Sequence, residues 1–216
     1  MTGRLPGDLC ANNALRAALK IPPVQPGQRI GLFGGSFNPP HRGHRHVALS
    51  ALTRLSLDRV WWLVSPGNPL KSHDDLSPLG ERLALTKAMA RHPRMAVTAF
   101  EAAVGTRYSA DTVEYLRKRF SDVRFVWVMG ADNLAGLHQW QAWRHLISLV
   151  PMAVVDRPGA ALPALSSPAA HAFQSARLPE GRATQLPLMT PPAWAFLHVP
   201  LDPASSTALR SSFNGS

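Results

Sequence analysis

The stretch RIGLFGGSFNPPHRGH, residues 29–44, indicates how the rest of the chain is arranged around it. Its apolar start, residues 30–33, has the length and composition of a buried strand. A glycine pair follows, with no side chain to keep a ligand from the backbone. Two histidines, His41 and His44, then lie at the start of an apolar-periodic stretch. Because a helix start favours anions and places side chains three apart on one face, the stretch predicts a polyphosphate site.

Length and composition limit the classes of protein to which the chain can belong. The chain has 216 residues, a formal net charge of +10 and a pI of about 11.2, which suits one domain with anionic partners. No run of five or six basic residues marks a nucleic-acid tail, so nucleic acid is not expected as a partner. The single cysteine, Cys10, fits a reducing compartment, and the apolar runs are too short to span a bilayer. We therefore expect a cytoplasmic protein without a membrane partner; its oligomeric state, a homo-oligomer included, stays open.

Apolar runs and helix-period stretches alternate along the chain. Strands are expected over residues 30–33, 60–64, 95–100, 125–129 and 152–155, and helices over residues 44–55, 77–91, 109–120 and 139–149. Ser77 and Ser109 are expected to cap two of these helices. This alternation is typical of an α/β, doubly wound (Rossmann-like) parallel sheet.

The two ends and the Pro/Ala-rich stretch are less regular. Residues 1–28 are interpreted as an N-terminal extension that forms a loose helix over 14–21 or stays disordered, ahead of a domain over 29–216. Residues 158–192 are expected to be mainly surface loop, with a peripheral helix near 169–176. A last strand over 194–199 and a short helix over 205–212 are expected to close the chain.

Polar motifs follow the predicted strands, where ligands gather in open α/β sheets. Lys71 ends SPGNPLK after the second strand, and Ser109 lies in TRYSADT after the third. Gly130, Asp132 and Trp140 follow the fourth, Arg157 follows the fifth, and SSTALR occupies residues 205–210. Taken one at a time, each motif has a plain alternative, such as a surface lysine, a core tryptophan or a capped helix.

In this order the motifs resemble those of a known family. Residues 35–44, directly after Gly34, match the ten-residue GxFxPxHxGH signature of the HxGH nucleotidyltransferase superfamily, and the closest likeness is to the bacterial nicotinate-nucleotide adenylyltransferases. The loop of Lys71, the GxDxxxxxxxW pattern ending at Trp140, the RPG turn and the SSTxxR string are similar to that family's motifs. In the family's SYTxDT segment Tyr108, Asp111 and Thr112 match, whereas Arg107 and Ser109 replace Ser and Thr.

The resemblance implies the nucleotidyltransferase type of fold and adenylyl transfer from ATP to nicotinate mononucleotide. Nicotinate adenine dinucleotide and pyrophosphate would be the products, as in NAD biosynthesis. Mg²⁺ would accompany ATP, held by phosphates and water rather than by protein ligands. The implied catalytic residues are His41, His44, Lys71 and Arg210; the implied ATP-binding residues are Gly34, Gly35, Ser36, Phe37, His41, His44, Arg157, Ser206, Thr207 and Arg210; those for the mononucleotide are Lys71, Tyr108, Ser109, Asp132 and Trp140.

Two alternatives stay open. One is another adenylyl- or cytidylyltransferase of the superfamily, such as the pantetheine-phosphate enzyme, which usually shows Thr where Pro40 and His41 fall here. The other is a basic RNA-associated module with an inert nucleotide fold, against which the intact histidine pair counts. Steep salt dependence of nucleic-acid retention would favour the module.

Overall fold

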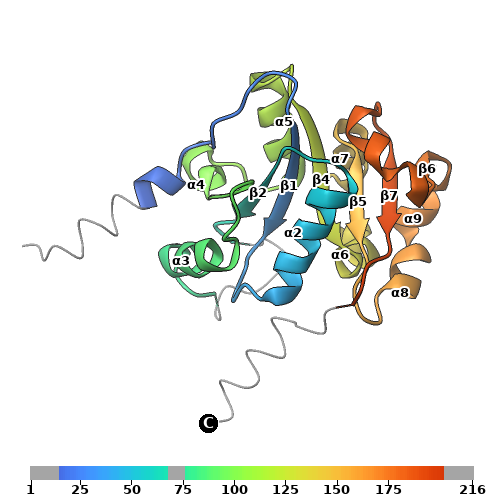
Figure 1. Cartoon of the computed structure of the whole chain (residues 1–216), viewed down its shortest axis with the longest axis horizontal. Helices are drawn as coiled ribbons and strands as arrows, with labels where there is room; N and C mark the ends of the chain where they lie inside the picture. The colour runs from blue at the N-terminus through green and yellow to red at the C-terminus, as the bar shows by residue number, and fades with distance from the viewer. Residues whose placement is uncertain (1–14, 68–75, 202–216) are drawn as a thin grey trace, which may run out of the picture.

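The centre of the molecule is a sheet in which every pair of neighbouring strands is parallel. The computed structural model describes residues 15–67 and 76–201. Over these ranges the strands are β1 (Arg29–Gly35), β2 (Arg59–Val64), β3 (Met95–Thr98), β4 (Arg124–Gly130), β5 (Met152–Val155), β6 (Arg177–Leu178) and β7 (Trp194–Leu197). Their order is β3-β2-β1-β4-β5-β7-β6. Figure 1 shows the part of this order from β2 to β6. The predicted doubly wound parallel sheet is confirmed.

Helices cover both faces of this sheet. The α-helices are α2 (Arg42–Arg54), α3 (Leu79–Met89), α4 (Phe100–Val104), α5 (Ser109–Arg119), α6 (Ala131–Gly136), α7 (Trp143–Leu149), α8 (Ala161–Leu165) and α9 (Pro168–Ala172). The 3₁₀ helices are η1 (Leu137–Gln139), η2 (Gln174–Ala176) and η3 (Glu180–Leu188). One core layer holds side chains of α2, α3 and η3, and the other holds side chains of α5 to α9. No helix of the described ranges is long and apolar enough to cross a membrane.

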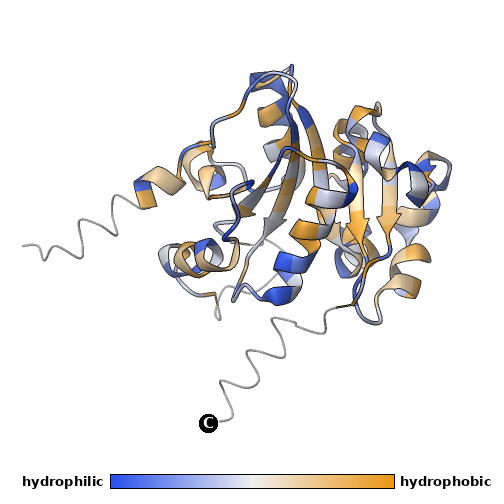
Figure 2. Cartoon of the chain, in the orientation of Figure 1, coloured by the Kyte–Doolittle hydropathy of each residue, from blue (hydrophilic) through white to orange (hydrophobic). Residues whose placement is uncertain are grey.

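The strands are apolar on both sides because both faces are covered. In β2 the adjacent side chains of Trp61 and Trp62 lie in opposite core layers, and both are fully buried. In β1, Leu32 and Phe33 divide in the same way. Figure 2 shows the result as hydrophobic colour along β5 and β7 in the middle of polar surface elements.

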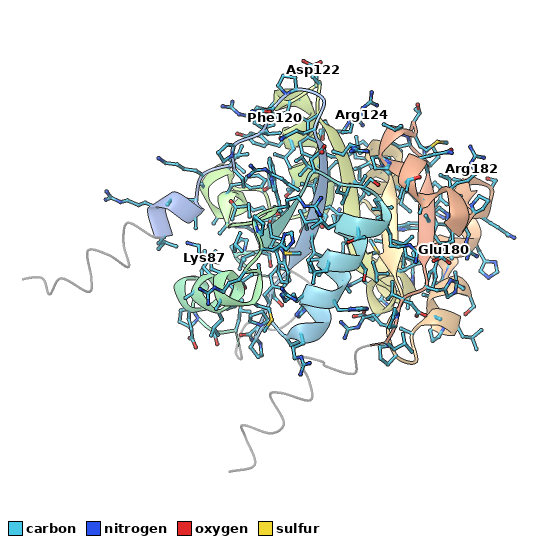
Figure 3. The ribbon with its side chains drawn as sticks, viewed as in Figure 1. Lys87, Phe120, Asp122, Arg124, Glu180 and Arg182 are labelled. Carbon is cyan, nitrogen blue, oxygen red and sulfur yellow. The ribbon has the colours of Figure 1, made fainter. Side chains whose placement is uncertain are left out.

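Helix α2 is tied down at the end remote from its histidines. Its last residue, Arg54, forms an ion pair of 2.6 Å with Glu180 of η3, and Glu180 also lies 2.7 Å from Nδ1 of His198 after β7. Figure 3 places Glu180 on the side of the molecule where β7 lies. These contacts join the end of α2 to η3 and to the segment that follows β7.

Several predicted boundaries are wrong for local reasons. The third strand ends at Thr98, because its Oγ1 accepts the N–H of Phe100 and starts α4. Ser77 is not an N-cap: its N–H donates to Oδ1 of Asn38 at 3.3 Å, and Pro78 precedes α3. Likewise Ser109 is the first residue of α5 rather than its cap, a place that Tyr108 takes.

The helix expected over residues 139–149 is interrupted. The 3₁₀ helix η1 ends at Gln139, and α7 begins only at Trp143. Between them Ala142 adopts φ 53°, in the left-handed region that no regular helix tolerates. Trp143, the first residue of α7, is partly buried against the core.

The prediction of a surface loop over residues 158–192 is also wrong. This stretch contains α8, α9, η2, β6 and η3; the predicted helix near 169–176 appears as α9 followed by η2. Its small side chains, such as Ala164 and Ala183, are buried. Alanine packs closely without adding a strong hydrophobic period, so the sequence pattern was weak. The last strand stops at Leu197, and the helix expected over 205–212 falls outside the described residues.

Part of the predicted N-terminal extension is held against the sheet. Residues 15–18 are helical, and Ala18 is buried. The carbonyl of Ala18 accepts the N–H of Ala99 at 2.7 Å and the hydroxyl of Thr98 at 3.0 Å. Further on, the N–H of Gly27 donates to the carbonyl of Asp122 at 2.7 Å, near the end of the sheet where β4 begins (Figures 1 and 3). Residues 15–28 are therefore ordered by contacts that no local pattern reveals, while the boundary at 28 stays a prediction.

Candidate functional site

The loop between β1 and α2 is built around two aromatic rings that fill the space beside its glycines. A Cβ on Gly34 would lie 2.8 Å from the Trp127 ring, and one on Gly35 would lie 3.1 Å from the Phe37 ring. Phe37 itself has φ 46°, an unusual value for a bulky residue, and its side chain is 2% exposed. The glycine pair thus has a packing reason as well as the predicted one of leaving the backbone open.

The two histidines lie together, as their spacing predicts. His41 is the N-cap of α2 and is buried, and His44 is in the first turn. Their ring centroids are 3.7 Å apart with an interplanar angle of 33°. The backbone N–H of His41 donates to Nδ1 of His44 at 3.2 Å. The pair therefore forms one rigid unit at the carboxyl end of β1.

His44 is held as a neutral donor. Burial first, then the neighbouring His41 and the charge of Arg157, lower the pKa of His44 from 6.5 to about 2. A neutral imidazole carries one proton, and here Nδ1 accepts a hydrogen bond. The proton is therefore on Nε2, so His44 can donate to a phosphate oxygen without carrying a charge.

The carboxyl ends of β4 and β5 bring more of the predicted residues to this place. Arg157 follows β5, and its charge reaches His44 strongly enough to lower the pKa of that imidazole. A Cβ on Gly130, the last residue of β4, would lie 2.5 Å from Oδ1 of Asp132 and 3.3 Å from Cγ of Arg157. His44, Arg157 and the exposed Asp132 therefore surround the point where three neighbouring strands end.

The residues predicted for the pyridine side are more widely spread. Trp140 is partly buried, and its ring lies edge-to-face with the Trp127 ring at a centroid distance of 6.4 Å. The Trp127 ring in turn lies beside Gly34 of β1. Tyr108 and Ser109 lie at the start of α5, after β3, which β2 separates from β1 in the sheet. Tyr108 is 37% exposed.

A buried polar cluster supports the start of α5. Thr112 donates to Oε1 of Glu101 at 2.7 Å and lies 3.1 Å from the hydroxyl of Thr106. Burial raises the pKa of Glu101, and the hydrogen bond from Thr112 offsets part of that rise. The cluster fixes the loop that carries Tyr108 and Ser109.

Four predicted site residues cannot be placed. Lys71, Ser206, Thr207 and Arg210 lie outside the described residues, so their roles stay predictions. Across residues 15–67 and 76–201, no three side chains of His, Cys, Asp or Glu come together as a metal site.

Sequence reasoning missed one residue beside this site. Arg82 of α3 is 1% exposed, and its guanidinium donates to the main chain of the loops that follow β1 and β2. Its signal was an arginine on the buried face of a helix, next to Leu83 and four residues before Thr86. An arginine in such a position has to find buried acceptors.

Comparison with known proteins identifies the family of the chain. The sequence model of the cytidylyltransferase-like family matches residues 32–212. A probable nicotinate-nucleotide adenylyltransferase of Rhizobium meliloti (strain 1021) is 58% identical over 186 residues, covering 86% of this chain and 99% of the relative. A protein of the same name from Methylorubrum extorquens is 57% identical over 183 residues, covering 85% of this chain and 99% of the relative.

Solved structures share the fold at low sequence identity. The Plasmodium falciparum nicotinic acid mononucleotide adenylyltransferase complexed with NaAD has a TM-score of 0.63 and 14% identity, covering 85% of this chain and 83% of that chain. The same protein complexed with APC has a TM-score of 0.60 at 13% identity, with the same coverage of both chains. On the family match and the two relatives at 57% and 58% identity, the chain belongs to the nicotinate-nucleotide adenylyltransferases, nucleotidyltransferases of the cytidylyltransferase-like family.

Proposed function

We propose that this chain transfers the adenylyl group of ATP to nicotinate mononucleotide, forming nicotinate adenine dinucleotide and pyrophosphate for NAD biosynthesis in the cytoplasm. The observation that carries the proposal is the neutral His44, paired with His41 at the start of α2 and close to the positive charge of Arg157. Membership of the adenylyltransferase family and the relatives' names support the choice of substrates.

In the proposed reaction the substrate supplies the nucleophile. A phosphate oxygen of the mononucleotide attacks the α-phosphorus of ATP, the bond from that phosphorus to the bridging oxygen breaks, and pyrophosphate leaves with the electron pair. No covalent enzyme intermediate is needed. The protein then has to position two anions and stabilise the charge that develops between them.

The described residues suit these two tasks. Nε2–H of His44 would donate to an oxygen of the transferring group, and the start of the 13-residue helix α2 would add its free N–H groups. Arg157 would face the phosphates with a full charge. His41, which fixes the ring of His44, would act beside it. Lys71, Ser206, Thr207 and Arg210 are expected to complete the triphosphate site, as the sequence predicts.

The mononucleotide would lie toward Trp140 and the start of α5. The indole of Trp140 offers a flat face to a pyridine ring, and Asp132 can accept hydrogen bonds from ribose hydroxyls. Tyr108 and Ser109 would meet the nicotinate group. Mg²⁺ would enter with ATP, bound by phosphate oxygens and water.

The test is pyrophosphate release with ATP and each acceptor in turn: nicotinate mononucleotide, nicotinamide mononucleotide and phosphopantetheine. We expect the nicotinate compound to give the highest kcat/KM. A higher value with phosphopantetheine would replace the proposal by the other transferase. Absence of turnover with every acceptor, together with RNA binding that weakens steeply with salt, would favour the non-catalytic module.

A further inference from the structure

Arg82 is the most deeply buried charged side chain of the described residues that the proposed mechanism does not use. It is the fourth residue of α3 and is 1% exposed. Its Nε donates to the carbonyl of Ser77 at 2.8 Å, and its Nη1 donates to the carbonyls of Ser36 and Ser65, each at 2.8 Å. Its Nη2 donates to the carbonyl of Pro66 at 3.3 Å.

These acceptors come from three segments that meet at the carboxyl ends of β1 and β2. Ser36 directly follows β1, Ser65 and Pro66 follow β2, and Ser77 precedes α3. The two strands end side by side, with Gly35 paired to Val64 and the N–H of Ser65 donating to the carbonyl of Gly35 at 3.0 Å. Four carbonyl oxygens pointing to one place repel each other unless a donor lies between them. The planar guanidinium with its fan of N–H groups fills that need, and neither lysine nor a neutral side chain can match it.

A short path of contacts leads from Arg82 to the histidine pair. The carbonyl that it binds on Ser36 belongs to the peptide bond that leads into Phe37, the residue with φ 46°. The Phe37 ring meets the His44 ring edge-to-face at a centroid distance of 5.1 Å. The hydrogen bond to that carbonyl therefore helps to keep Phe37 in its unfavourable backbone conformation. It thereby also positions the Phe37 ring, which His44 contacts.

We propose that Arg82 is a positioning residue for adenylyl transfer, which sets the β1–α2 loop so that His44 meets the transferring phosphate. The inference rests on the proposed function and adds to it a residue that touches neither substrate. Displacement of a catalytic group by about 1 Å can cost on the order of a hundred-fold in rate. The effect of Arg82 should therefore appear in kcat and depend on the presence of His44.

The experiment is a double-mutant cycle with Arg82→Met and His44→Ala, assayed by pyrophosphate release from ATP and nicotinate mononucleotide at 15 °C. We expect Arg82→Met to lower kcat on the order of a hundred-fold, with little change in the KM for ATP. In the Arg82→Met background, His44→Ala should cost at most about ten-fold, against on the order of a hundred-fold in the unaltered chain. Near-UV circular dichroism checks that each variant is folded.

The matched control is Arg94→Met. Arg94 also donates to a main-chain carbonyl, that of Leu57 at 3.3 Å, but it lies just before β3, at the opposite end of the strands. Its kcat should stay within about two-fold of the unaltered chain, and its effect should add to that of His44→Ala.

Arg82→Lys covers the case in which Arg82→Met does not fold. An ammonium group keeps the charge but lacks the planar set of N–H donors, so we expect kcat to fall by more than about three-fold but by less than on the order of a hundred-fold. A folded Arg82→Met or Arg82→Lys protein with kcat within about three-fold of the unaltered chain would overturn the inference, as would additive effects in the cycle. If the unaltered chain releases no pyrophosphate from these substrates, the proposed function itself fails, and that result is separate from either outcome for Arg82.

Discussion

Two regions beside the strand ends of this sheet contain different kinds of polar group. The first region is the β1–α2 junction, and the second is the segment from β3 to α5. At the β1–α2 junction a neutral imidazole, His44, lies near the charge of Arg157 and is packed among aromatic rings. At the segment from β3 to α5 a buried carboxyl, Glu101, is bound to the hydroxyl of Thr112. Under the proposed function, the first arrangement would present donors to phosphate, and the second would fix a loop whose residues select the substrate. The difference predicts that changes at the first region act on rate and changes at the second act on selectivity and stability.

The largest effect should come from removing the donor at the first region. We expect His44→Ala to lower kcat on the order of a hundred-fold or more, because a preorganised donor acts on charge that develops in the transition state. The KM for ATP should change little, since other groups are expected to bind the ground state. Steady-state kinetics measure both. The exposed His171 of α9 gives the control, because His171→Ala should leave kcat unchanged. A folded His44→Ala enzyme with near-normal kcat would remove the distinction between the two regions.

The second region should decide between nicotinate and nicotinamide mononucleotide. Charge-assisted hydrogen bonds from N–H groups to the nicotinate carboxylate are worth about 1.5–3 kcal/mol, and an amide in that place loses them. We expect kcat/KM to be about ten- to a hundred-fold higher for the nicotinate form. Competition assays with both acceptors measure the ratio directly. Equal kcat/KM values for the two compounds would show that the start of α5 does not distinguish a carboxylate from an amide.

Deleting residues 1–26 tests whether the N-terminal segment that contacts the second region matters for catalysis or only for stability. The deletion removes the carbonyl contacts of Ala18 to Thr98 and Ala99, and it uncovers apolar surface beside β3. We expect kcat to stay within about two-fold and Tm to fall by several degrees, at about 2–4 °C for each kcal/mol lost. Thermal unfolding measures the change in Tm, and kinetics on the same sample measures the change in kcat. A folded truncated protein that has lost most of its kcat would place these residues at the reaction itself.

The stability of the first region should weaken in acid. The pKa of His44 is lower in the folded protein, about 2, than its ordinary value of 6.5, so below pH 6.5 the unfolded chain binds the extra proton. Stability is then full above pH 6.5 and falls as the pH drops toward 2. Between pH 7.5 and 5.0 the Tm of His44→Asn should fall about 2–4 °C less than that of the unaltered protein, for about 1 kcal/mol after allowance for partial exposure. Parallel slopes for the two proteins would show that His44 takes up a proton at no cost.

The second region should respond to pH with the opposite sign, and with the smallest effect. Burial raises the pKa of Glu101 above its ordinary value of 4.5, so the folded protein holds the proton more tightly than the unfolded chain. Its contribution is present at low pH and is lost as the pH rises above 4.5. Glu101→Gln keeps an acceptor for Thr112 without the charge, so at pH 8 its Tm should be about 2 °C higher than that of the unaltered protein. At pH 4.5 the difference should shrink, and a lower Tm at pH 8 would contradict this account.

The sequence alone determined the parts of the molecule in which local pattern and chemistry agree. The apolar runs predicted six of the seven strands described, the third and the last of them two residues too long, because a strand covered on both faces has to be apolar throughout. The spacing of His41 and His44 at a helix start predicted that their rings would lie together, since residues three apart share a face.

Only the tertiary structure decided what depends on long-range contacts. The alanine-rich stretch 158–192 folds because small side chains allow close packing, which leaves no hydrophobic period to detect. Residues 15–28 are ordered by carbonyls that meet Thr98 and Ala99, some eighty residues away. The pKa of His44 depends on burial and on Arg157, and Arg82 gains its acceptors from loops of two other strands. A sequence pattern records which groups are present, but the free energy of a buried charge or hydrogen bond depends on the partners that the fold brings to it.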